Sequence, residues 1–159
     1  MTMNNDQPIC EVNEYGDKRW HLNGKLHRED GPAIEHADGY KHWFINGKRH
    51  REDGPAIEGA DGKYWFLNDK LHRVDGPAVE CADGSKSWYL NGKQHREDGP
   101  AVEYANGDKC WYLNGKLHRE DGPAAEYTDG TKDWYVDGEK IEVTDNDTFL
   151  RMINLKAFW

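Results

Sequence analysis

Apolar and polar residues alternate along this chain in short runs, and the runs recur at a fixed step. Residues 88–110, WYLNGKQHREDGPAVEYANGDKC, form one copy of the recurring unit. Its tryptophan returns after every 22 or 23 residues, at Trp20, Trp43, Trp65, Trp88, Trp111 and Trp134. Self-similarity at such a period is typical of repeat architectures, in which each unit buries the apolar surface of its neighbour.

Two series of turn signals divide each unit. The first is an Asn-Gly pair between apolar alternations, which favours a type I′ hairpin turn because both central residues need a positive φ. It stands at Asn23-Gly24, Asn46-Gly47, Asn91-Gly92 and Asn114-Gly115, with Asn68-Asp69 and Asp137-Gly138 as variants. The second stands at Asp38-Gly39, Asp61-Gly62, Asp83-Gly84, Asn106-Gly107 and Asp129-Gly130. Two turns per unit predict an all-β, elongated, single-layer antiparallel meander of about eleven short strands.

The alternation of side chains predicts two different faces of this sheet. Trp111 and Leu113 point to one side, and Cys110 and Tyr112 point to the other. The tryptophan ladder is accompanied by Leu22, Ile45, Leu67, Leu90, Leu113 and Val136, and the opposite face carries Phe44, Phe66, Tyr89, Tyr112, Tyr135, Ile34, Ile57, Val79 and Val102. Both faces are partly apolar, so the sequence leaves open which of them is covered.

A segment of the type HREDGPA separates the strands of each unit. It occupies residues 27–33, 50–56, 95–101 and 118–124, and Val74 replaces the glutamate in the third unit. Proline donates no hydrogen bond, so we expect a bulge or tight loop along one long edge of the array. The arginine is placed to pair with the aspartate two residues later, as a structural brace. These pairs are Arg28 and Asp30, Arg51 and Asp53, Arg73 and Asp75, Arg96 and Asp98, and Arg119 and Asp121.

The two ends of the chain differ from the array. We expect a flexible N-terminus at residues 1–8, then half a unit and about five and a half units over residues 9–140. Residues 141–159 predict a capping helix, with Thr144 as its N-cap and Phe149, Met152 and Ile153 on its apolar side. Such a helix would cover the open end of the sheet, which is otherwise a pairing hazard.

Composition narrows the classes of partner. The net charge is −9, and an acidic chain repels phosphate backbones, so we expect no direct nucleic-acid binding. No apolar run approaches the ~20 residues of a membrane span, and the start, MTMNNDQPIC, lacks the features of a signal peptide. We therefore expect a cytoplasmic protein without membrane contact, and free thiols at Cys10, Cys81 and Cys110.

No motif for catalysis, metal or cofactor binding stands out. A histidine recurs beside the arginine, at His27, His50, His72, His95 and His118. Five equivalent sites favour a structural loop, because an active site is normally one special pocket. Histidines of successive units would stand ~9.5 Å apart, too far for zinc to bridge. We expect no enzyme, no metal and no cofactor.

The 23-residue period, the WxxNGKxH core and the closing ADG turn resemble the MORN repeat over residues 9 to about 140. The sequence departs from that pattern where REDGPA replaces a glycine-x-glycine after the histidine and where the tyrosine-glycine pair before the tryptophan is missing. The HREDGPA variant resembles repeat proteins of bacteriophages and bacteria, some of them grouped with MORN-type antitoxins. The resemblance implies an elongated, non-enzymatic sheet that binds proteins or, in eukaryotic members, membrane lipids.

Function is therefore a hypothesis with alternatives. The first is a protein-binding module of a phage or bacterium that inhibits a host, toxin or defence protein, a nucleic-acid-binding enzyme included, because an acidic array imitates a phosphate backbone. The alternative is a small-ligand or lipid binder, such as an aromatic cage for a quaternary ammonium. A second copy of the chain is a further partner for an uncovered face. Positions that vary between units are the candidates for partner recognition: Tyr40, His42, Arg49, Tyr64, Gln94 and Tyr104, together with Val74 and Cys81.

Overall fold

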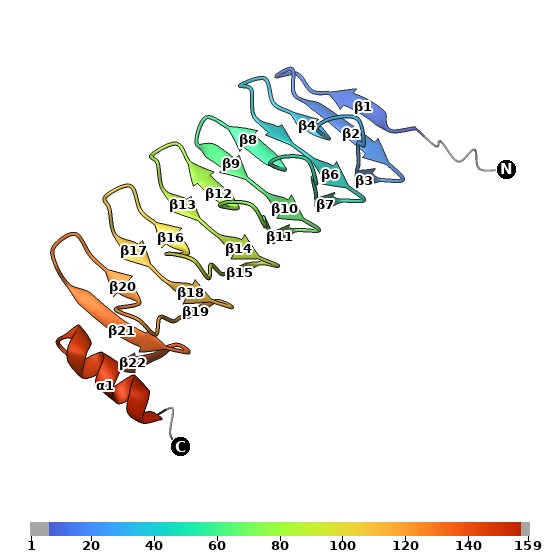
Figure 1. Ribbon diagram of the computed structural model, residues 1–159. Helices are drawn as coiled ribbons and strands as arrows, with labels where there is room; N and C mark the ends of the chain where they lie inside the picture. The colour runs from blue at the N-terminus through green and yellow to red at the C-terminus, as the bar shows by residue number, and fades with distance from the viewer. Residues whose placement is uncertain (1–6, 157–159) are drawn as a thin grey trace.

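A computed structural model describes residues 7–156 as a row of β-hairpins that ends in one helix (Figure 1). Neighbouring strands pair antiparallel throughout this part, and successive hairpins lie side by side in one row. The fold is therefore an all-β, single-layer antiparallel meander with a short C-terminal helix, as the two series of turns predict. Residues 1–6, which belong to the segment predicted to be flexible, and residues 157–159 lie outside the described part.

The main sheet contains most of the strands. Its order is β1 (Ile9–Val12), β2 (Lys18–Leu22), β4 (Ile34–Glu35), β5 (Lys41–His42), β8 (Ile57–Gly59), β9 (Gly62–Tyr64), β12 (Val79–Cys81), β13 (Lys86–Ser87), β16 (Val102–Glu103), β17 (Lys109–Cys110), β20 (Ala125–Glu126), β21 (Lys132–Val136) and β22 (Glu139–Ile141), with β3 (Lys25–Leu26) beside β2. Four two-stranded ladders accompany it: β6 (Phe44–Ile45) with β7 (Lys48–Arg49), β10 (Phe66–Leu67) with β11 (Lys70–Leu71), β14 (Tyr89–Leu90) with β15 (Lys93–Gln94), and β18 (Tyr112–Leu113) with β19 (Lys116–Leu117). The helix is α1 (Asn146–Lys156).

Each two-stranded ladder continues a main-sheet strand beyond a tryptophan. Trp43, for example, separates β5 from β6. Its N–H donates to the carbonyl of Ala56 at 2.8 Å, and its carbonyl accepts from the N–H of His50 at 3.1 Å. The backbone of Trp43 is thus hydrogen-bonded to both ends of the seven-residue loop 50–56. The predicted number of about eleven short strands is wrong for this reason, and the described chain has 22.

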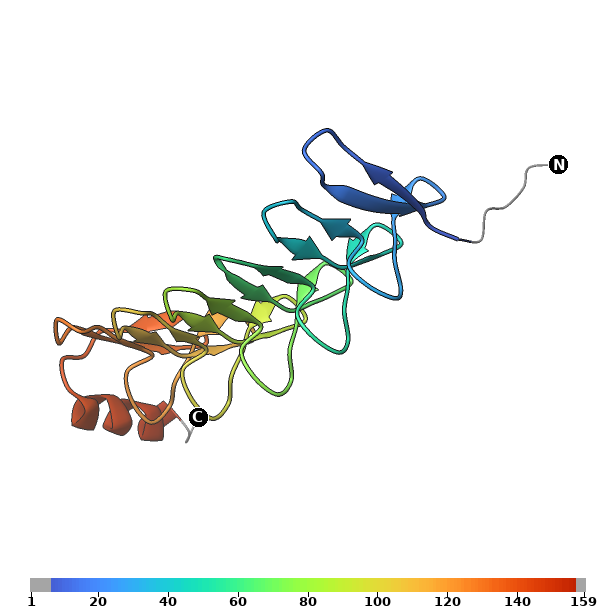
Figure 2. The ribbon, with the colours of Figure 1, turned by 90° about the horizontal axis from the view of Figure 1, so that it is seen from above.

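The loops that leave the sheet at the tryptophans fold over one face. We call them the arginine loops: residues 27–33, 50–56, 72–78, 95–101 and 118–124. Figure 2 shows them on one side of the sheet, where α1 also lies. The predicted bulge or tight loop is a loop, but its predicted place along a long edge is wrong, because the arginine of each loop lies over an indole ring on the face of the sheet. The Cζ atom of Arg51 lies 4.1 Å from the centre of the Trp43 ring.

The strand register assigns side chains to the two faces, since residues directly opposite each other share a face. His42 lies opposite Ile57 on one face, and Lys41 lies opposite Glu58 on the other. By alternation, Trp43 shares the face of Lys41 and Glu58. We call this the tryptophan face, which the arginine loops cover. The opposite side is the tyrosine face.

Small residues form much of the core under the arginine loops. The alanine that ends each loop has no exposed surface, at Ala33, Ala56, Ala78, Ala101 and Ala124. Its carbonyl accepts the N–H of the tryptophan in the same unit, at 2.8 to 2.9 Å. The core under the loops is therefore thin, and a second buried cluster, Val102, Cys110 and Ala125 with Tyr112 and Leu117 packed against it, lies on the tyrosine face.

The hairpin turns have the backbone that their sequence predicts. Asn46 has a φ of 53° and Gly47 a φ of 80°, as a type I′ turn requires. In the third unit Asp69 takes the place of the glycine at a φ of 65°. Asp and Asn are the side chains that tolerate this left-handed region best. In every turn of this series, the residue types therefore suit the backbone conformation.

Helix α1 covers the last tryptophan in place of an arginine loop. Trp134, Ile141 and Phe149 form a buried cluster, against which Leu150 and Ile153 pack. The helix begins after Asp145, whose carboxylate accepts the backbone N–H of Thr148 at 2.8 Å. The predicted N-cap, Thr144, is therefore wrong by one residue. The predicted apolar side also needs correction, because Met152 is exposed and Leu150 takes its place.

We expect Phe149→Ala to open the C-terminal unit. Phe149 is completely buried against Trp134, and truncation of a buried phenylalanine costs about 3–5 kcal/mol. Repeat arrays lose stability locally, so hydrogen exchange should accelerate in β21 and β22 and much less in β9. Leu155→Ala is the control, since Leu155 is exposed. Unchanged exchange in β21 would contradict the capping role of α1.

Candidate functional site

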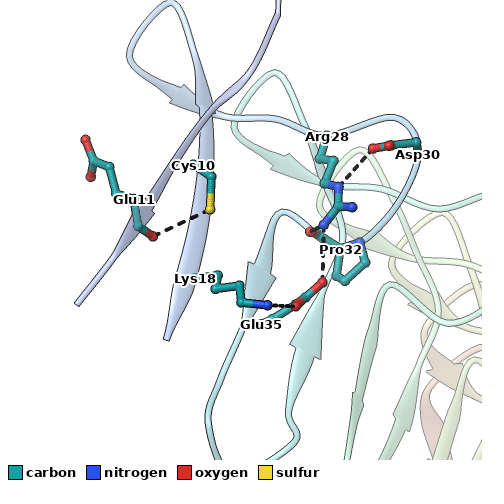
Figure 3. A network of polar contacts seen from close by, with 7 residues as sticks. All are labelled: Cys10, Glu11, Lys18, Arg28, Asp30, Pro32 and Glu35. Carbon is teal, nitrogen blue, oxygen red and sulfur yellow. Dashed lines mark hydrogen bonds and ion pairs between the residues drawn. The ribbon is translucent and has the colours of Figure 1, made fainter. Parts of the chain in front are cut away.

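The repeated arginine is the most highly connected side chain of each unit, as Figure 3 shows for Arg28. Its Nε donates to Asp30 Oδ1 at 2.8 Å, and its Nη1 donates to the carbonyl of Pro32 at 3.3 Å and to Glu35 Oε1 at 3.2 Å. The guanidinium lies over the Trp20 ring, 4.1 Å from its centre. Stacking and forked hydrogen bonds together fix the loop on the sheet.

The same contacts recur in the other four units. The arginines are Arg51, Arg73, Arg96 and Arg119, over Trp43, Trp65, Trp88 and Trp111, with Nε bonded to Asp53, Asp75, Asp98 and Asp121. The spacing predicts this brace to the aspartate. It does not predict the other arms, to the proline carbonyl, the strand glutamate and the indole.

The glycine of each arginine loop is required by the arginine. A Cβ atom at Gly99 would lie 3.0 Å from Arg96 Cζ. The equivalent distance at Gly54 is 2.8 Å from Arg51 Cζ. Real Cβ atoms rarely approach so closely, so any larger residue would push the guanidinium off the indole. The packing of the arginine thus accounts for the glycine of each loop.

The repeated histidine joins each unit to the next. His72 Nδ1 accepts the backbone N–H of Asn91 at 3.1 Å, and His27 Nδ1 does the same for Asn46 at 3.2 Å. The contact recurs from His50 to Asn68, from His95 to Asn114 and from His118 to Asp137. A ring nitrogen that accepts this bond has its lone pair occupied. The histidines therefore support the hairpin turn of the neighbouring unit, which fits the structural interpretation of the repeated trio.

The candidates for partner recognition gather on the tyrosine face. Tyr64 lies opposite Ile57 and Val79, and Gln94 lies opposite Tyr89. By alternation, Tyr40 shares the side of His42, and Tyr104 shares the side of Val102. Cys81 belongs to the same face, whereas Val74 lies in an arginine loop and is 83% exposed. Arg49 lies opposite Phe44 on this face too, so seven of the eight positions chosen because they vary between units share one surface.

Among these candidates, Arg49 also has a structural role. Its Nε donates to Asp69 Oδ1 at 2.8 Å, and its guanidinium lies 4.0 Å from the centre of the Phe66 ring. Asp69 is the residue that replaces the turn glycine of its unit. The two departures from the repeat pattern, at Arg49 and Asp69, therefore compensate each other.

The tyrosines and cysteines of the tyrosine face keep their protons at neutral pH, whereas burial lowers the pKa of His42. Burial is the main cause that raises the pKa of Tyr64, Tyr104 and Tyr112 above its ordinary value. Burial also raises the pKa of the Cys81 and Cys110 thiols. The face therefore presents neutral hydroxyl donors among apolar side chains, and its thiols lack the thiolate character of catalytic cysteines.

Within residues 7–156, no group of three or more His, Cys, Asp and Glu side chains is placed to hold a metal ion. The three cysteines are free. No helix in this part of the chain has the length and hydropathy to span a bilayer.

Comparison with known proteins adds no identification. A scan against protein-family models finds no match to this chain, and a search of curated proteins finds none either.

We expect Arg96→Ala to lower the free energy of unfolding by about 2–4 kcal/mol, because it removes the stacking on Trp88 and three hydrogen bonds of a largely buried guanidinium. Asp98→Ala should cost clearly less, since the Asp98 side chain is 84% exposed. Urea unfolding of both variants measures the difference, and Arg96→Lys is the control that keeps the charge. Equal losses of unfolding free energy for Arg96→Ala and Asp98→Ala would contradict the expectation that the arginine contributes more to stability than the aspartate.

Acid should weaken the arginine loops. Hydrogen bonding to the arginine and then its charge lower the pKa of Asp30, Asp53 and Asp98 below the ordinary value of 3.8. A lowered folded-state pKa adds stability above the unfolded value, and this stability is lost as the pH falls through the folded pKa. Melting temperatures of the wild type and a triple Asp→Asn variant should differ at neutral pH and converge as the pH falls through the lowered folded-state pKa of these aspartates. A constant difference down to acid pH would contradict the ionic role.

Proposed function

We propose that this chain is a non-enzymatic protein-binding module that docks a partner protein on its tyrosine face. One observation carries the proposal: the chain covers its tryptophan face with its own loops, whereas Tyr104 and Tyr127 of the tyrosine face are exposed above the buried Val102, Cys110 and Ala125. The variable positions Tyr40, His42, Tyr64 and Tyr104 lie on that face.

The chemistry of the tyrosine face suits protein recognition. Tyrosine combines a large apolar area with a hydroxyl donor, and it is enriched among interface hot spots. Tyr104 and Tyr127 are exposed, at 51% and 39% of their surface. The strands beneath them are braced on the other side, so the partner would meet a preformed surface and little ordering entropy would be lost.

The resemblance to phage and bacterial repeat proteins supports a more specific form of the proposal. In that form the module occupies and inhibits a host, toxin or defence protein in the cytoplasm of a bacterium. The net charge of −9 suits a target with a basic surface, such as an enzyme that binds nucleic acid.

The alternative of an aromatic cage has less support. A quaternary ammonium ligand needs the open face of an aromatic ring. The Arg28, Arg51 and Arg96 guanidiniums already lie 4.0 to 4.1 Å from the ring centres of Trp20, Trp43 and Trp88. The cation position on these rings is filled from within the chain. Lipid binding is disfavoured by the acidic charge.

Affinity capture with matched variants tests the proposal. The immobilised wild-type protein is exposed to bacterial lysate, and captured proteins are identified by mass spectrometry. We expect Tyr104→Ser to weaken capture of a particular protein by about 30-fold, as the loss of a hot spot does. Tyr15→Ser is the control, because Tyr15 is exposed in the turn between β1 and β2, in the first hairpin of the array.

Three results would contradict the proposal. The first is a partner whose affinity is the same for Tyr104→Ser and the wild type, with both variants folded. The second is saturable binding of choline or anionic liposomes without any protein partner. The third is turnover of a substrate by the purified protein.

A further inference from the structure

Neighbouring arginine loops enclose clefts on the tryptophan face, on the side of the sheet opposite the tyrosine face. The cleft between residues 27–33 and 50–56 has a volume of about 690 Å³, and Trp43 and Ile45 belong to its lining. Trp43 is half-buried, so the part of the indole that Arg51 leaves uncovered faces this cleft. The floor is therefore aromatic and aliphatic.

Equivalent clefts recur along the array. One of about 570 Å³ lies between residues 95–101 and 118–124, with Trp111 and Leu113 in its lining. Another of about 350 Å³ lies between residues 50–56 and 72–78, with Trp65 in its lining. Figure 2 shows the loops that form their walls in a row along the sheet. The clefts thus form a periodic groove.

The walls of the clefts are acidic. Two guanidiniums and four carboxylates line the cleft at Trp43, which gives it a net charge of −2: Arg28, Arg51, Glu29, Asp30, Glu52 and Asp53. The cleft at Trp111 has the same balance. In the cleft at Trp65, Val74 replaces one glutamate, and the net charge is −1 instead of −2. An apolar floor with this charge is complementary to a cationic side chain that has a long aliphatic stem.

The wall glutamates are not used to hold the fold together. The aspartate of each loop braces the arginine, whereas Glu97 is 84% exposed and contacts His95 Nε2 only at 3.6 Å. Glu29 and Glu52 are exposed in the same way, with histidine contacts of 3.6 Å. The repeated glutamates therefore offer charge that is free to meet a ligand.

The step between clefts selects a particular ligand geometry. Successive units are two strand spacings apart, or ~9.5 Å. A polyproline II helix advances ~9.3 Å over three residues and presents every third side chain to the same side. In an extended strand every second side chain faces the same side, so the spacing of these side chains differs from the spacing of the clefts.

We infer that this groove binds a basic segment of a polypeptide in the polyproline II conformation, with Lys or Arg at every third position. The aliphatic stem of each cationic side chain lies against the part of the apolar cleft floor that the chain's own arginine leaves uncovered, and the wall glutamates pair with its charge. The inference is independent of the proposed docking on the tyrosine face, since the two surfaces lie on opposite sides of the sheet.

Peptide binding to the whole protein tests this inference. The probe is a peptide of repeated Arg-Pro-Pro triplets, followed by quenching of tryptophan fluorescence, because indoles line the clefts. The comparison peptide has the same length and composition, with all arginines clustered at one end. We expect the periodic peptide to bind saturably and at least about tenfold more tightly, with an affinity that falls as salt is raised.

Matched variants locate the binding site. Replacement of Glu29, Glu52, Glu97 and Glu120 by Gln should weaken binding at least about tenfold. The control with an equal loss of charge replaces Glu11, Glu14, Glu139 and Glu142, which are exposed and lie outside these clefts. Val74→Glu restores the missing carboxylate, and we expect it to tighten binding.

Several results would overturn the inference. Equal affinity for the periodic and clustered peptides would show attraction by net charge alone. Absence of saturable binding, or an equal effect of both sets of Gln substitutions, would exclude the groove. Loss of peptide binding in Tyr104→Ser would move the site to the other face. Each of these results leaves capture of a protein on the tyrosine face to its own test.

Discussion

A single-layer sheet has no second layer to cover either of its faces, and the arginine loops supply the cover for one of them. Each loop leaves the sheet and returns to it at one tryptophan, whose N–H and carbonyl bind its two ends. The loop arginine then lies on the indole of the same unit. The glycine, the buried alanine and the histidine contact with the next turn all depend on this geometry. At the C-terminal end, Phe149 of α1 packs on Trp134 where a further loop would lie.

Local chemistry made much of the fold predictable. The positive φ of Asn46 and Gly47 is a property of those residue types, so the turns and the antiparallel meander follow from the sequence. The alternation of Trp111 and Tyr112 likewise predicts two distinct faces. The pairing of Arg96 with Asp98 follows from their spacing in the chain.

The remaining features depend on contacts between segments, which spacing does not encode. Nothing in a Gly-Pro-Ala sequence shows that Ala101 is completely buried or that the loop lies on a face rather than an edge. The strand breaks arise from the hydrogen bonds of the tryptophan backbone, which any residue type can make. The helix cap at Asp145 rather than Thr144 is a choice between two good capping residues. The candidate site follows the same rule: variation between units indicated the tyrosine-face residues, but only the register brought them together.

The arginine loops and α1 cover one face of the sheet, while Tyr104 and Tyr127 on the other face are exposed (Figure 2). Hydroxyl-radical footprinting of the free protein, read by mass spectrometry residue by residue, tests this difference between the faces most directly. We expect rapid modification of Tyr104 and Tyr127 and strong protection of Trp134 and Phe149, in proportion to their exposure. Protection of Tyr104 and Tyr127 to the level of Trp134 would contradict it, because the tyrosine face would then be covered as well.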